Sequence, residues 1–201
     1  LFLLKGKSPI SGYLPPLKMN LFFLHPDPKE CAKQHCDKHV VKMILELVQM
    51  LYTCHNILGT HPLPVDGYKS FGVKHPTCLW IRDCESNYRY TVKLTRYLCE
   101  EYTHRYFKIH KCESHLEFFE NHIPVFKGSV YTPDTVMSTN KKLSEQGMSP
   151  VPLAMYSDVK LPDTIDSYRK YYTVYKKRFA KWTNREVPYW YSQVDIFRLP
   201  E

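Results

Sequence analysis

The sequence has little glycine and no long apolar run. Only seven of its 201 residues are glycine, which excludes collagen-like chains and flexible glycine-rich repeats. No stretch approaches the roughly 20 consecutive apolar residues that a membrane-spanning helix requires. We therefore expect a globular protein with no membrane partner, and its length suits one large domain.

Paired cysteine motifs are also absent. The seven cysteines are an odd number and include no CxxC pair, and most of them fall at core-like positions of expected helices. Buried free thiols are typical of a reducing compartment, so we expect an intracellular protein. A disulfide framework is not expected.

Acidic residues are in deficit. The chain has 20 Asp and Glu against 28 Lys and Arg, a formal net charge of +8. This surplus favours an anionic partner, and we expect nucleic acid, with double-stranded DNA as the first candidate. Sixteen tyrosines suit half-buried surfaces and the stacking contacts of nucleic-acid grooves.

Residues 28–56 are the stretch around which the rest of the chain is organised. A proline in the first turn and the lack of internal glycine or proline predict one continuous helix of about eight turns. Apolar residues cover most of its sides, as in a central core helix. Its polar residues share one narrow stripe: Cys31, His35, His39, Lys42, Glu46 and Gln49.

This stripe is either a solvent-facing strip or the floor of a functional site. In the second interpretation the catalytic candidates are His35, His39, Lys42 and Glu46. Lys42 in apolar surroundings could attack a sugar C1′ atom as a neutral amine, with Glu46 as general acid or base. The same two residues could instead form an ordinary i,i+4 ion pair.

The first three stripe residues also suggest a metal site. Cys31, His35 and His39 follow one another at intervals of four, a recurrent ligand spacing on helices. No acidic cluster or cysteine pair completes the site, so zinc is a weak alternative and no other cofactor is expected.

The remaining sequence predicts a single, mainly α domain over residues 19–201 with minimal β structure. A Pro-rich extended arm at residues 1–18 precedes it, and this arm is a candidate contact for a partner protein. Long loops are expected at residues 57–76 and 123–161. The other expected elements are a strand at 20–24 and helices at 77–107, 113–121 and 163–183.

Two basic surfaces accompany these helices. They are candidate phosphate contacts, although charges flanking a core face would give a similar pattern. The first set is Arg82, Arg89, Lys93 and Arg96, and the second is Lys170, Lys177, Lys181 and Arg185.

Several blocks carry a family resemblance. They are MNLFFLHPDPKECAKQHCDKHVVKMILE, HPTCLWIR, LCEEYTHRY and KWTNREVPYW. These blocks resemble a little-characterised family of large DNA phages and giant viruses over residues 19 to about 191. This resemblance implies the host cytoplasm, the nucleus or a virion as the location. More distantly, the short Asn-Leu segment, the Ala-x-Gln-His run at residues 32–35 and the aromatic tail resemble phage pyrimidine-dimer DNA glycosylases of the endonuclease V type.

The second resemblance implies a DNA base-excision enzyme, with or without lyase activity. Such enzymes use a free N-terminal amine as nucleophile and carry a catalytic glutamate and arginines on this helix. Here eighteen residues precede Met19, and Lys38 and Lys42 stand where the arginines are expected. The chain is therefore processed, or a lysine replaces the amine, or the chemistry is absent.

Two other functions fit the same sequence. One is a non-catalytic structural or assembly protein that binds nucleic acid or a neighbouring chain. The other is a zinc-stabilised binding module.

Overall fold

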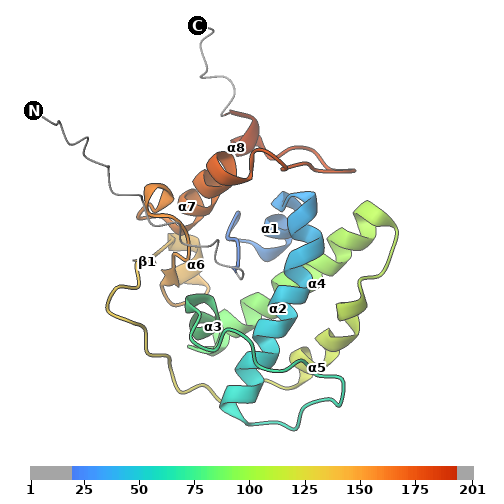
Figure 1. Cartoon of the computed structure of the whole chain (residues 1–201), viewed down its shortest axis with the longest axis vertical. Helices are drawn as coiled ribbons and strands as arrows, with labels where there is room; N and C mark the ends of the chain where they lie inside the picture. The colour runs from blue at the N-terminus through green and yellow to red at the C-terminus, as the bar shows by residue number, and fades with distance from the viewer. Residues whose placement is uncertain (1–19, 194–201) are drawn as a thin grey trace, which may run out of the picture.

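Helices make up most of the described chain in the computed structural model, which covers residues 20–193 (Figure 1). The expected mainly α fold class is confirmed, and the expected arm at 1–18 lies outside the described residues. The helices are α1 (Pro28–Gln34), α2 (Asp37–Leu58), α3 (Pro76–Ile81), α4 (Glu85–Tyr106), α5 (Leu116–Asn121), α6 (Lys141–Glu145), α7 (Thr164–Tyr171) and α8 (Tyr189–Ser192).

Short turns and one small sheet complete the fold. The 3-10 turns are η1 (Lys111–His115) and η2 (Ser157–Val159), and a π-helical turn, η3 (Tyr172–Lys176), continues α7. Strands β1 (Met137–Ser138) and β2 (Val151–Pro152) pair antiparallel, with Ser138 opposite Val151. Both strands and η2 lie in the segment at 123–161 that was expected to be irregular.

Helix α2 crosses the centre of the molecule and packs along α4 (Figure 1). As expected for a core helix, Ile44, Leu47, Val48 and Leu51 are almost completely buried. The expectation that apolar contacts surround α2 on nearly every side is wrong in one place, because Val41 and Leu45 are 43% and 38% exposed. α2 therefore presents an exposed ridge on its N-terminal half.

The prediction of one helix over residues 28–56 is wrong. α1 ends at Gln34, the next two residues are extended, and α2 begins at Asp37. The C-terminal segment takes the backbone groups at the break: the indole of Trp182 donates to the Gln34 carbonyl (3.0 Å), and the Asp37 N–H donates to the Lys181 carbonyl (2.8 Å). Tertiary hydrogen bonds thus replace helical ones.

Two other predicted helices are also interrupted. The helix expected at 77–107 is divided into α3 and α4 by a turn in which Asp83 accepts a hydrogen bond from the Ser129 N–H (2.8 Å). The helix expected at 163–183 is α-helical only through Tyr171 and then widens into η3.

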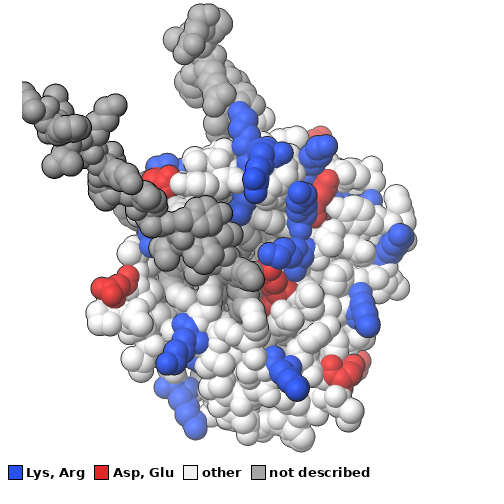
Figure 2. All heavy atoms as spheres, viewed as in Figure 1, with Lys and Arg blue, Asp and Glu red and all other residues white. Residues whose placement is uncertain are grey.

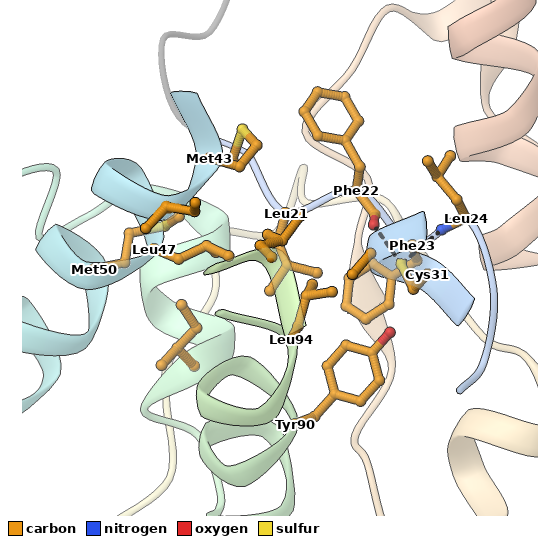
Figure 3. Close-up of a cluster of buried hydrophobic side chains, with 14 of the residues drawn as sticks. Leu21, Phe22, Phe23, Leu24, Cys31, Met43, Leu47, Met50, Tyr90 and Leu94 are labelled. Carbon is orange, nitrogen blue, oxygen red and sulfur yellow. Dashed lines mark hydrogen bonds between the residues drawn. The ribbon is translucent and has the colours of Figure 1, made fainter. Parts of the chain in front are cut away.

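Residues 20–24 are buried but do not form the expected strand (Figure 3). Part of their backbone bonds to α1 instead of to a neighbouring strand, because the Cys31 thiol donates to the Phe22 carbonyl (3.2 Å) and accepts from the Leu24 N–H (3.4 Å). Phe23 fills the space between Trp80 and Tyr90. The segment is therefore a core element that anchors the start of the domain.

A buried ionic cluster joins α2, α4 and the C-terminal segment. Arg105 has no exposed side-chain surface and donates to Glu101 (2.7 Å) and Asp37 (2.8 Å). Arg185 also binds Glu101, through two of its nitrogens. Asp37 accepts further bonds from the backbone and hydroxyl of Thr183. These bonds hold the chain after η3 against the helix break.

All seven cysteines are free, and six of them are buried, in agreement with the prediction of unpaired thiols. Among residues 20–193, no helix is long and apolar enough to cross a membrane.

Candidate active site

Glu46 and Lys42 lie at the edge of the exposed ridge of α2. The Glu46 carboxylate is 2.7 Å from the Lys42 ammonium, and the side chains are 11% and 62% exposed respectively. Burial raises the pKa of Glu46, while Lys42 and a hydrogen bond from the Asn20 backbone oppose this rise. The carboxyl group can therefore take up a proton more readily than an exposed glutamate.

The two histidines of the stripe lie beneath the surface. His39 shares a hydrogen bond with the Tyr172 hydroxyl and stacks on Phe22, with ring centroids 4.3 Å apart. His35 bonds through Nδ1 to the Cys31 carbonyl (2.8 Å). Burial lowers the pKa of His39 well below its usual range and that of His35 to about 4. Both rings are thus neutral at neutral pH and pack the floor of the site.

Sequence reasoning missed Lys176, the last residue of the π-helical turn η3. Its ammonium lies 4.5 Å from the ring centroid of Tyr171 and 5.9 Å from those of Phe22 and Phe179. It also donates to the Tyr171 hydroxyl (3.2 Å). An amine surrounded by rings is shielded from water, which disfavours its charge, although the ring faces attract it.

The charge state of Lys176 depends on the same neighbours as that of Glu46. Burial lowers the pKa of Lys176, repulsion from Lys42 lowers it further, and attraction to Glu46 opposes both. The three groups therefore form one electrostatic cluster between α2 and η3. In the sequence, the only signal for Lys176 is that it lies in an aromatic segment. In a regular helix its side chain would lie beside the aromatic face and not among the rings.

Cys31, His35 and His39 do not form the suspected metal site. The break after α1 removes the straight-helix spacing, and Cys31 and His35 are engaged with backbone groups. No group of three His, Cys, Asp or Glu residues suited to a metal ion occurs within residues 20–193. The zinc-module alternative therefore has no site in the described part of the chain.

The first basic set is largely engaged within the protein. Arg96 forms two hydrogen bonds to Glu120, Arg89 pairs with Glu85, and Arg82 donates to a backbone carbonyl. Arg89, Lys93 and Arg96 also line a surface cavity of about 350 Å³. Intramolecular pairing reduces the charge that this set offers to phosphates.

The second set is divided between structure and surface. Arg185 belongs to the ionic cluster and Lys170 donates to the Asp158 carbonyl, whereas Lys177 and Lys181 are exposed. Figure 2 shows Lys and Arg side chains gathered where the start of α2 meets the α7–α8 region. Lys38, on the first turn of α2, is exposed as well. The cationic surface is thus next to the Glu46 site.

A family model described as pyrimidine dimer DNA glycosylase matches residues 19–123, slightly more than half of the chain. The chain belongs to the pyrimidine dimer DNA glycosylase family. The searches of curated proteins and of solved structures each found no match. Membership of this glycosylase family confirms the more distant of the two resemblances and makes DNA the substrate polymer of the family.

The match to the glycosylase family covers only part of the site. It begins at Met19, directly before the residue whose backbone contacts Glu46, and it includes both Lys42 and Glu46. It ends before η3, so Lys176 lies outside the matched region.

Proposed function

We propose that this protein cleaves the base–sugar bond at pyrimidine dimers in duplex DNA, with Glu46 at the chemical centre. One observation carries the proposal. A buried carboxyl group with a raised pKa sits at the Asn20 backbone, where the family match begins, beside a solvent-facing Lys42.

The role of Glu46 follows from the charge that develops as a base departs. Cleavage of a glycosidic bond builds positive charge on the sugar, which a nearby carboxylate stabilises. A carboxyl group with a raised pKa can also give a proton to the departing base. Lys42 keeps the carboxyl group in place and offers its exposed ammonium to a phosphate.

Lys176 is our choice for the attacking amine. Its neutral Nζ atom bonds to C1′ while the bond from C1′ to the base breaks. The base keeps the bonding electrons, takes a proton from Glu46 and stays joined to its partner through the cyclobutane ring. A proton then moves from Nζ to O4′ as the C1′–O4′ bond breaks, which leaves a protonated imine between Nζ and C1′. Lys42 and Lys38 fit this step less well, because both are exposed to water. An α-amine near Asn20, in a chain that begins there, is the competing nucleophile.

Borohydride trapping with peptide mapping tests this proposal. On duplex DNA with one pyrimidine dimer, we expect a covalent adduct that maps to Lys176 and disappears in Lys176→Arg. Lys170→Arg, in the preceding α7, is the matched control and should still be trapped. An adduct on another amine would reassign the nucleophile. If the parent protein does not cleave the base–sugar bond at the dimer, the proposed glycosylase function is refuted.

DNA binding should weaken steeply as salt is added. Lys38→Glu together with Lys181→Glu reverses two exposed charges near α2, and each lost phosphate contact reduces the slope of log K against log salt by about one. We therefore expect a slope smaller by roughly two in anisotropy titrations. The control is Lys141→Glu, whose side chain is 89% exposed on α6. Equal slopes in parent and double variant would place the DNA elsewhere.

A further inference from the structure

The turn at residues 107–111 presents two large apolar side chains to solvent. Phe107 is 84% exposed and Ile109 is 78% exposed. Exposed aromatic surface is unfavourable in water, so a side chain kept there without a folding contact suggests a binding role.

The backbone of this turn is also unfavourable for its sequence. Phe107 closes α4 in the left-handed region (φ 55°, ψ 35°), and its N–H donates to the Thr103 carbonyl (2.8 Å). Glycine is the usual residue at this position of a helix end, and a bulky side chain there is rare. Retained strain of this kind is a feature of functional positions.

The turn is held to the end of α4 and also contacts α2. The Thr103 hydroxyl donates to the Lys108 carbonyl (3.1 Å), and the His110 ring packs edge-on against Tyr102. His110 also interacts with the backbone of Val41, one residue before Lys42. The turn therefore borders the exposed ridge of α2, which also carries Lys42.

Cations flank the two apolar side chains. Lys108 and Lys111 lie within the turn itself, and both are exposed. An apolar tip between cations matches a DNA duplex, whose phosphates bind the cations while an apolar wedge enters the base stack. An enzyme that acts on a base must first take it out of that stack.

We propose that Phe107, supported by Ile109, is a wedge that opens the base stack of duplex DNA bound across the exposed ridge of α2. The inference rests on the proposed function and adds a separate role. The wedge acts on the shape of the duplex, whereas Glu46 and Lys176 act on the bond to the base. Phe107 is therefore a positioning residue.

The test compares the same dimer in a duplex and in single-stranded DNA, with 2-aminopurine beside the dimer as a fluorescent reporter of unstacking. For Phe107→Ala we expect the fluorescence rise to disappear and single-turnover cleavage of the base–sugar bond in the duplex to slow by about 10- to 100-fold. Cleavage in single-stranded DNA should be unchanged. Phe107→Gly should show the same loss without a lower melting temperature, since glycine accepts this backbone conformation.

The control is Phe71→Ala, which removes another exposed phenyl ring, from the loop between α2 and α3. An unchanged duplex rate in Phe107→Ala would overturn the wedge and leave the glycosylase intact. An equal loss on both substrates, or a change of oligomeric state in Phe107→Ala, would also overturn it. Only an inactive parent protein would refute the underlying function.

Discussion

Glu46→Gln is expected to slow cleavage of the base–sugar bond at a pyrimidine dimer by a factor of about 10²–10⁴, the usual contribution of a general acid or base. Glutamine keeps the size of the side chain but can neither carry the negative charge nor donate a carboxyl proton. Because Lys42 is mostly exposed, the loss of its ion pair should cost little stability. We expect the melting temperature to change by only a few degrees.

The matched control for this prediction is Glu85→Gln. Glu85 also forms an i,i+4 pair with a basic residue, Arg89, but both side chains are about half exposed. Activity should be unaffected there. If Glu46→Gln cleaves the base–sugar bond as fast as the parent protein, the Lys42–Glu46 ion pair on α2 is only structural.

Arg105→Met is expected to lower the free energy of unfolding by about 3–5 kcal/mol. The substitution leaves Glu101, which is 3% exposed, without one of its two arginine partners. Although burial raises the pKa of Glu101, the bonds from Arg185 and Arg105 hold it below its usual range. Without these bonds, the buried negative charge of Glu101 would be poorly paired and would destabilise the folded state.

Urea unfolding monitored by circular dichroism measures this loss. Arg89→Met is the control, because it breaks an exposed ion pair of the same spacing, and such pairs contribute about 0–1 kcal/mol. Equal, small effects of both substitutions would show that the buried cluster does not stabilise the helix break.

The sequence predicted the core better than the ends of the helices. Apolar periodicity located Ile44 and Leu47 in the core of α2, because burial follows directly from the pattern. The break after Gln34 could not be predicted locally. It depends on a hydrogen bond donated by the Trp182 indole and one accepted by the Lys181 carbonyl, and both residues are about 150 positions away in the chain.

The functional site, like the helix ends, could be predicted from the sequence only in part. Lys42 and Glu46 were paired correctly because their spacing of four residues fixes their distance on a helix. Lys176 was missed as a site residue because the π-helical turn η3 changes the direction of the side chains that follow α7. Net charge predicted an anionic partner, but only the fold shows that Arg185 is committed to Glu101.

The most direct test of the whole account is cleavage of the base–sugar bond, read as an alkali-labile abasic site, in a duplex whose single cyclobutane pyrimidine dimer is either left intact or photoreversed before the protein is added. We predict cleavage at the intact dimer by the parent protein, none in the photoreversed duplex, and almost none by Glu46→Gln. Cleavage that is independent of the dimer, or no cleavage by a folded, DNA-binding parent protein, would contradict the account.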